Sequence, residues 1–391
     1  METNFETIEG RSTQFYLLMS FLAISAAVGL VSSYLMYSKG LYITGMTNRV
    51  PWGLQIILAV FYIGLSAGSL VISSLYAIFG KIEYKPFARI SVSLAILFLM
   101  AALLSIILDW GRPDRIFVPF SHFNPVSMFS INPFLYTVYI FICFVYLWAM
   151  FREKEKLVRI IALIAVIWAI GVHSGTGAIF GFVPRELFQS PLLPPSFIAA
   201  ALSSGTALMI LVIFVLFRLT RRALDNRLMV RLGKLLAVFI VVVMYFVLVE
   251  NAYRLYLPES RKAAYYFLFG GFHSSVFWYG MIVIGSIIPA GILFNPRTGS
   301  SIPWIVLSSV LTVFGVLCER YLIVIPGQTH PVDLFPNMEI VGSALEEGIV
   351  NYSISFYEVL QAIGILGIIG FLFVLGLRLF RLLPTEAKIS E

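Results

Sequence analysis

The chain has 391 residues, of which 60% are hydrophobic and only 12% are charged. Soluble globular domains carry about 25% charged residues, so this composition excludes a soluble protein and indicates one embedded in lipid. The formal net charge of +7 is no evidence for nucleic-acid binding, because the basic residues of a membrane protein report its topology.

Apolar windows of about 20 residues recur along the whole chain, which predicts an all-α integral membrane protein with ten transmembrane helices. The first thirteen residues hold three glutamates and one arginine, and the apolar run after them is too long for a signal peptide, so we expect a retained helix. The predicted spans are 14–38, 52–80, 86–110, 131–151, 157–182, 194–219, 227–256, 271–294, 302–325 and 354–381.

The distribution of Lys and Arg predicts the orientation. Ten spans place both termini on one side, and that side, with the loops after spans 2, 4, 6 and 8, holds 18 of the 27 basic residues. The positive-inside rule makes this side cytoplasmic. Both termini are therefore expected in the cytoplasm.

A weak internal repeat is visible in the second and sixth spans. Residues 64–73 (GLSAGSLVIS) are similar to residues 201–210 (ALSSGTALMI), and both stretches hold small residues that let membrane helices approach closely. The repeat unit is four helices, an even number, so we expect two four-helix bundles related by an axis along the membrane normal. The predicted parts are the cytoplasmic N-terminus and first span (1–51), the first bundle (52–182), the second bundle (194–325), and the outer loop, last span and cytoplasmic C-terminus (326–391).

Ionisable side chains inside the spans are costly and mark either a functional site or a paired structural one. Apart from basic residues at the inner helix ends, they fall in the outer halves of their helices, which predicts a polar cavity near the outer surface. They are Asp109, His173, Glu250, Arg254, Glu319, Arg320 and Glu358. The expected charge pairs are Asp109 with Arg112 or Arg115, Glu250 with Arg254, and Glu319 with Arg320. Each pair either holds helix ends together as a structural ion pair or belongs to the cavity.

The histidines allow two interpretations. His173, in the stretch HSGTG of the fifth span, either hydrogen-bonds a neighbouring helix or transfers protons to a bound molecule. His122 either orders its interfacial loop or belongs to the site. A haem b would need His273 at the same depth as His173, so no haem is expected. The two cysteines, Cys143 and Cys318, form no CxxC motif, which argues against an iron–sulfur cluster held by this chain.

The outer loops indicate a partner. Residues 326–353 hold four acidic residues and no Lys or Arg, and together with residues 111–130 they form a large outer surface. This surface is either a docking face or merely solvated. A chain with a polar outer cavity and no redox centre of its own is typical of a protein that serves a partner.

Three stretches resemble one known family. Residues 51–69 (PWGLQIILAVFYIGLSAGS), 108–115 (LDWGRPDR) and 122–139 (HFNPVSMFSINPFLYTVY) resemble the polysulfide-reductase membrane-subunit (NrfD/PsrC-like) family. The resemblance covers residues 52–320, and the ten spans look like the branch found in hydrogenase-2-type and alternative complex III membrane subunits.

The resemblance implies a function. Such subunits hold no covalently bound or metal-ligated cofactor and anchor an extracytoplasmic, ferredoxin-like iron–sulfur subunit in a prokaryotic cell (inner) membrane. Through it they serve a molybdopterin or hydrogenase-type catalytic subunit. Most bind menaquinone or another quinone near that cluster, and some couple this chemistry to proton translocation. The expected function is thus that of a non-catalytic or quinone-reactive subunit of a respiratory oxidoreductase complex.

Site residues follow from the motifs and from chemistry. A quinone carbonyl needs a hydrogen-bond donor, its reduction needs protons, and aromatic side chains such as Trp52 and Tyr253 can pack on its ring. The predicted quinone-binding residues are Trp52, Asp109, Arg112, His122, Asn124 and His173. The predicted proton relay is Asp109, His173, Glu250, Arg254, Glu319 and Arg320. Protons drawn from the cytoplasm would need an inner half-channel, for which the candidate hydroxyls are Ser66, Ser69, Thr206, Tyr245 and Ser286.

Two other functions remain open from sequence. The first is a quinone-independent anchor that conducts protons while electrons pass directly between partner proteins. The second is a solute transporter with parallel repeats. Against the transporter, the polar residues do not reach the midplane, and no matched broken helices are evident.

Overall fold

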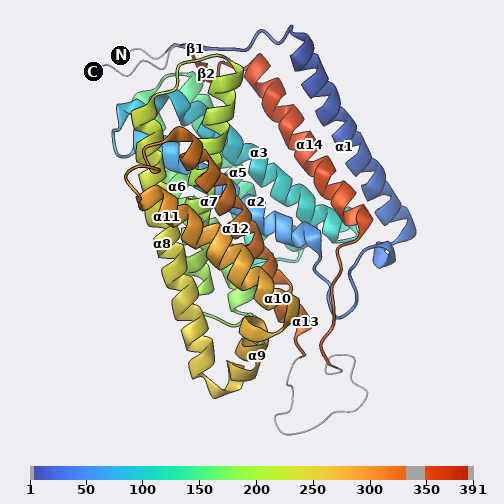
Figure 1. The fold of residues 1–391 in the computed structure, drawn as a ribbon. Coiled ribbons are helices and arrows are strands. Elements are labelled where there is room, and N and C mark those ends of the chain that lie inside the picture. Colours follow the sequence, from blue (N-terminus) through green and yellow to red (C-terminus); the bar gives the residue numbers. More distant parts are fainter. Residues whose placement is uncertain (1–3, 332–347, 386–391) are drawn as a thin grey trace.

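The computed structural model describes residues 4–331 and 348–385, and these contain ten helices long and apolar enough to cross a membrane. This confirms the predicted all-α integral membrane fold (Figure 1). The spans are α1 (Thr13–Lys39), α2 (Leu54–Ala77), α3 (Lys85–Asp109), α5 (Met128–Phe151), α6 (Glu155–Gly181), α7 (Leu193–Leu219), α8 (Asn226–Tyr256), the eighth span Gly271–Phe294, α12 (Ile302–Val324) and α14 (Phe356–Leu379).

Short elements join the spans. They are β1 (Phe5–Glu6), η1 (Leu41–Ile43), η2 (Ile82–Tyr84), η3 (Pro113–Arg115), α4 (Val118–Ser121), α9 (Pro258–Phe269), α13 (Pro326–Thr329) and β2 (Leu383–Pro384). The acidic part of the predicted outer loop, residues 332–347, lies outside the described residues.

Helix starts follow ordinary capping chemistry. The Ser12 hydroxyl accepts the Phe15 amide at 3.1 Å before α1, and the Asp225 carboxylate accepts the Arg227 amide at 2.8 Å before α8. Pro86 occupies the first turn of α3, where its missing amide costs no hydrogen bond.

The eighth span departs from a simple α-helix. It consists of α10 (Gly271–Ser275), a π-helical segment η4 (Val276–Ile287) and α11 (Ile288–Phe294). The Ser286 hydroxyl accordingly donates to the carbonyl of Met281, five residues earlier, at 3.0 Å. Such segments are rare and frequently occur at functional sites, and no sequence pattern predicted this one.

The centre of the molecule is the crossing of α2 and α7, which are among the most buried spans. Gly68 and Gly205 meet there, and a Cβ on either glycine would overlap the backbone of the other helix. These two glycines are equivalent in the predicted repeat. Equivalent residues meet where a two-fold axis passes between two repeats, so this contact is expected if the predicted bundles are related in that way. The division into two bundles stays a prediction that this contact supports.

The first and last spans pack as a separate pair along one flank (Figure 1). Gly29 of α1 and Gly364 of α14 bring the two backbones together, and the Ser32 hydroxyl donates to the Tyr357 carbonyl at 2.8 Å. Much of α1 otherwise exposes apolar side chains, as expected for a helix that faces lipid.

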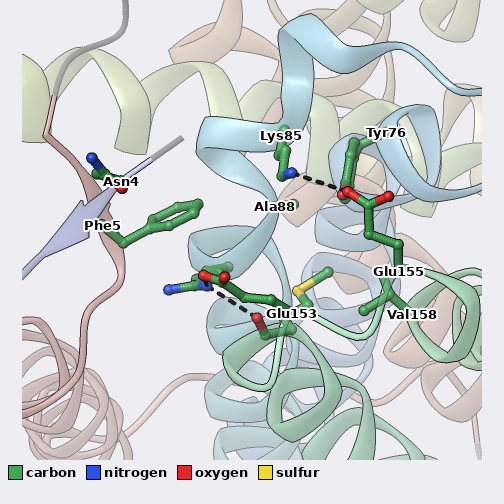
Figure 2. A pocket seen from close by; sticks show the side chains of 10 residues that line it. Asn4, Phe5, Tyr76, Lys85, Ala88, Glu153, Glu155 and Val158 are labelled. Atoms are coloured by element: carbon green, nitrogen blue, oxygen red, sulfur yellow. Dashed lines mark hydrogen bonds and ion pairs between the residues drawn. The ribbon is translucent and has the colours of Figure 1, made fainter. Parts of the chain in front are cut away.

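Both termini lie at the same end of the bundle, which we call the terminal face; the opposite end is the distal face (Figure 1). β1 and β2 pair in antiparallel fashion there. Buried Arg89 ties the chain ends to α5, because it donates to the carbonyls of Arg381 and Met150, both at 3.0 Å, and lies 3.7 Å from the centre of the Phe5 ring. Figure 2 shows the cavity beside it, into which Phe5 and Lys85 project.

The glycine crossing makes a prediction about packing. Gly205→Ala is expected to destabilise the protein by about 1–3 kcal/mol, because overpacking a filled interior forces backbones apart. Thermal unfolding of the purified protein in detergent measures this. Gly171→Ala is the matched control, since a Cβ at Gly171 meets nothing within 4 Å. An unchanged unfolding midpoint for Gly205→Ala would show that the crossing is looser than described.

Candidate functional site

Five of the predicted site residues form one buried line through α6, α12 and α8. The residues, which we call the buried line, are His173, Arg320, Glu319, Glu250 and Arg254, and each is at least nine-tenths buried. His173 lies within electrostatic range of Arg320, and Glu319 within range of Glu250. The ion-pair distances are 3.8 Å for Arg320–Glu319 and 2.6 Å for Arg254–Glu250. Residues from both predicted bundles therefore meet in one polar path.

Arg320 is the least satisfied member of this line. Its side chain is 0% exposed, and none of its three guanidinium nitrogens has a hydrogen-bond partner among the described residues. Besides Glu319, its main contact is the ring of Phe197, 4.2 Å from the guanidinium carbon. Cation–π attraction offsets only part of the cost of burying a charge. Arg320 thus presents donors that a ligand or ordered water is needed to satisfy.

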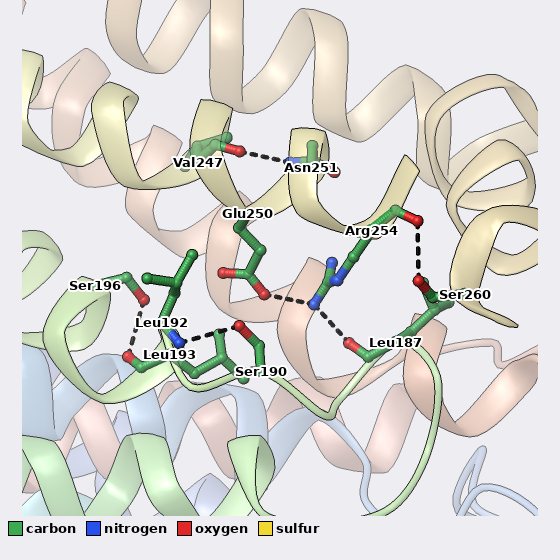
Figure 3. Close-up of polar contacts among 10 residues, drawn as sticks. All are labelled: Leu187, Ser190, Leu192, Leu193, Ser196, Val247, Glu250, Asn251, Arg254 and Ser260. Atoms are coloured by element: carbon green, nitrogen blue, oxygen red, sulfur yellow. Dashed lines mark hydrogen bonds and ion pairs between the residues drawn. The ribbon is translucent and has the colours of Figure 1, made fainter. Parts of the chain in front are cut away.

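Glu250 and Arg254 form the tightest ion pair of the line (Figure 3). Arg254 also donates to the carbonyl of Leu187 at 2.8 Å, and its own carbonyl accepts the Ser260 hydroxyl at 2.9 Å. These bonds fix α8 to the loop that follows α6 and to the start of α9. Arg254 therefore has a structural role, whereas the Glu250 side chain has no hydrogen bond among the described residues other than the one to Arg254.

Two small cavities share Glu319. One of about 50 Å³ is also lined by Glu250, Asn251 and Arg254, and has room for a few waters. The other, of about 10 Å³, is lined by hydroxyls that include Ser286 and holds about one water at most. Because η4 borders both cavities, its π-helical geometry shapes the surroundings of Glu319.

His173 is held in one orientation. Its Nδ1 lies 2.9 Å from the carbonyl of Ala169, which only accepts, so Nδ1 carries a hydrogen. In the neutral ring Nε2 is then an acceptor that makes no hydrogen bond of ordinary geometry with the described residues, and the backbone of Ile63 lies near the ring. His173 can therefore receive a proton at Nε2, and it donates there only when it is protonated.

Asp109 lies away from this line. It is buried at the end of α3, within electrostatic range of Glu358 and beside the backbone of Gly53. The expected pair with Arg112 or Arg115 is wrong: no ion pair of Asp109 with either arginine forms among the described residues, and Arg112 instead binds Asp114 at 3.0 Å on the exposed surface. Gly111, with φ of 65°, turns the chain outward between them. The guanidinium of Arg112 lowers the pKa of Asp114, not that of Asp109.

Glu358 is a residue whose role the sequence left unassigned. Its two carboxylate oxygens accept the Tyr352 hydroxyl at 2.6 Å and the amides of Ser355 at 2.8 Å, Gly45 at 2.9 Å and Leu54 at 3.2 Å. Burial and this bond raise the pKa of Tyr352. The capping-box motif Ser355-x-x-Glu358 was the available signal. Glu358 thus joins three chain segments through a carboxyl group whose two oxygens both accept hydrogen bonds.

Trp52 connects the surface to the buried line through aromatic rings. The Gln328 side chain accepts its amide at 2.9 Å and donates to its carbonyl at 3.1 Å. Its ring lies 5.5 Å from that of Phe180, which is 6.2 Å from that of Phe197. Phe197 in turn contacts Arg320.

Other predicted residues lie outside this arrangement. His122 is exposed and contacts the Ser121 hydroxyl at 2.9 Å, and the Asn124 side chain accepts the Val126 amide at 3.0 Å. Both make these contacts within the surface loop, and their part in quinone binding stays a prediction. Tyr245 is 62% exposed on α8, so its prediction as an interior hydroxyl is wrong: the helix turns it away from the core. The described residues contain no group of three His, Cys, Asp or Glu that could hold a metal ion.

A family model described as "Polysulphide reductase, NrfD" matches residues 42–332. The chain belongs to the NrfD family. An "Hdr-like menaquinol oxidoreductase integral membrane subunit" of Archaeoglobus fulgidus is 40% identical, over 99% of this chain and 98% of that protein. A selenate reductase subunit of Mesobacillus selenatarsenatis is 27% identical over 96% of both. A "Menaquinone reductase, integral membrane subunit" of Nitratidesulfovibrio vulgaris is 23% identical over 84% of both.

The Glu358 anchor makes a stability prediction for this NrfD-family chain. Glu358→Ala is expected to cost roughly 3 kcal/mol or more, because hydrogen bonds to a charged group contribute about 1.5–3 kcal/mol each. Thermal unfolding measures the loss. Glu155→Ala is the control, since Glu155 is largely exposed and a surface ion pair is worth about 0–1 kcal/mol. Equal midpoints for the two variants would contradict a structural role for Glu358.

Proposed function

We propose that this chain is the membrane subunit of a respiratory oxidoreductase complex, that it binds menaquinone or a related quinone, and that the buried line transfers protons. The observation that carries the proposal is Arg320, a buried guanidinium with no hydrogen-bond partner among the described residues, at the end of an aromatic path from Trp52. The names of the relatives, two of which mention menaquinol or menaquinone, support it.

The side chains along this path have the chemistry that a quinone needs, although they pack against one another. Flat aromatic side chains, here Trp52, Phe180 and Phe197, supply apolar walls for a quinone ring, and Arg320 supplies donors for a carbonyl oxygen. A bound quinone would supply two-electron chemistry that also takes up or releases two protons. Electrons would come from, or go to, a partner's iron–sulfur cluster.

The chain's own part in this chemistry is to hold and move protons. His173 takes a proton at Nε2, which its Nδ1 bond to Ala169 leaves available. Glu319 has one carboxylate oxygen without a partner among the described residues and faces the cavity it shares with Glu250. Waters in that cavity would connect the two carboxylates.

The partners and orientation belong to the same proposal. We expect the distal face to be extracytoplasmic, because the terminal face carries most of the Lys and Arg. There the surface formed by α4 and its flanking loops would dock a ferredoxin-like iron–sulfur subunit, which joins the chain to a molybdopterin or hydrogenase-type enzyme. The membrane would be a prokaryotic cell membrane.

Quinone binding makes a kinetic prediction. Trp52→Ala in the purified complex is expected to raise the KM for a menaquinol analogue about tenfold, which corresponds to about 1.4 kcal/mol. Trp304→Leu, at a tryptophan 45% exposed at the start of α12, is the control and leaves KM unchanged. Full activity in quinone-depleted membranes would overturn the quinone function and favour the quinone-independent anchor.

Proton transfer makes a separate prediction. Glu250→Gln and Glu319→Gln are expected to reduce proton uptake in proteoliposomes at least about tenfold while the amount of assembled complex falls less than about twofold. The amide keeps the side-chain shape but cannot carry a proton. Glu259→Gln, at an exposed position in the first turn of α9, is the control. If assembly falls in parallel with proton uptake, the two glutamates are structural.

A further inference from the structure

A cavity of about 340 Å³ opens at the terminal face, and the proposed function does not use it (Figure 2). It lies among the ends of α2, α3, α5 and α6. Ion pairs flank it, Lys85 with Glu155 and Arg89 with Glu153, both at 3.3 Å. Both signs of charge are thus already neutralised, so the lining suits water better than a charged ligand.

A stripe of buried polar side chains leads from this cavity along α5. Met150 lines the cavity, and Tyr146, Cys143, Tyr139 and Tyr136 follow at spacings of four, three, four and three residues, which place them on one helix face. All are buried. At 1.5 Å per residue the stripe rises about 21 Å, most of the way across the hydrocarbon core.

Hydroxyl groups of neighbouring helices border the stripe. The Tyr146 hydroxyl donates to the Ser73 carbonyl at 3.4 Å, and Tyr139 lies beside the Ser66 hydroxyl and Cys143. At the far end the Tyr136 hydroxyl is 2.9 Å from that of Thr176. Thr176 is one helical turn from His173, where the buried line begins.

Packing alone does not explain these hydroxyls. The oxygens of Tyr62 and Tyr139 are buried and have no hydrogen-bond partner among the described residues, as is also true of His173 Nε2. Phenylalanine would fill the same space without leaving a buried polar atom unpaired, which is costly. Waters between the helices would satisfy all three atoms.

We propose that water enters this cavity and that the α5 stripe conducts protons from the terminal face to His173. This inference rests on the proposed function, since it supplies the protons for the buried line. Each hydroxyl or water accepts one proton and passes one on, so none changes its net charge. The proton taken up at the cavity arrives at Nε2 of His173, the ring nitrogen without a partner among the described residues.

Radiolytic hydroxyl-radical footprinting of the purified complex in ¹⁸O-labelled water tests the hydration directly. Tyr136, Tyr139 and Tyr146 are expected to take up labelled oxygen at least about tenfold faster than Phe87 and Phe217. These two phenylalanines are as buried as the tyrosines, and their rings pack against each other with 5.4 Å between the centres. They are the control because each lies against an apolar ring, whereas the tyrosines lie beside polar groups. Labelling of the tyrosines no faster than that of the phenylalanines would overturn the hydrated route.

Two variants test conduction. Tyr139→Phe and Tyr146→Phe remove only a hydroxyl, and each is expected to lower proton uptake from the terminal-face side at least about fivefold, with quinol turnover retained when an uncoupler is present. Tyr245→Phe on the exposed side of α8 is the matched control. Uptake equal to that of the control would overturn the route. A third outcome separates the two proposals. If the tyrosines are labelled but the complex shows no quinone-dependent turnover, the hydrated route is supported and the proposed function is refuted.

Discussion

The contact between Gly68 and Gly205 is the constraint on which the rest of the interior depends. Because neither residue has a side chain, α2 and α7 cross backbone to backbone, and the helices packed on either side are drawn together. α6 and α12 both contact this central pair. That approach is what brings His173 and Arg320 within electrostatic range of each other. A larger residue at the crossing would separate His173 from Arg320 and the rest of the buried line.

Hydrogen bonding distinguishes the structural polar residues of this interior from those of the candidate site. A buried polar side chain with all its hydrogen bonds made has a structural role, and one that lacks partners is a candidate for binding. Glu358 accepts four hydrogen bonds and needs nothing further, so its burial stabilises the join between α14 and α2. Arg320 makes none with the described residues, although it is equally buried. Arg320 has an ion pair with Glu319 at 3.8 Å but no hydrogen bond, and a buried charged group without hydrogen bonds is costly unless water or a ligand supplies them. The same reasoning separates bonded Arg254 from the unpaired Nε2 of His173.

The sequence predicted the ten spans well, because hydropathy over about twenty residues is a strong signal that tertiary packing does not override. It also identified every member of the buried line, since charge inside a span is rare. The predicted ion pair between Asp109 and Arg112 was wrong, because the backbone turn at Gly111 decides which residue Arg112 reaches. Arg112 binds Asp114 and lies away from Asp109. The sequence also failed for Tyr245 and for η4, because the direction of a helix face and a π-helical segment both depend on neighbours.

Tyr139 and Tyr146 were overlooked for a related reason. Tyrosine in a membrane helix is ordinarily interpreted as an interfacial or packing residue, and its spacing on α5 is equally that of an apolar core stripe. Only burial together with an unpaired hydroxyl makes Tyr139 notable. The stripe ends at Thr176, one helical turn from His173, and Arg320, which pairs with Glu319, lies within electrostatic range of the same ring. The two proposed proton paths both lead toward His173, and since its Nδ1 hydrogen is held by Ala169, both would use the single nitrogen Nε2. Nε2 holds one proton at a time. On this proposal, protons from the two paths are therefore transferred through His173 one after the other.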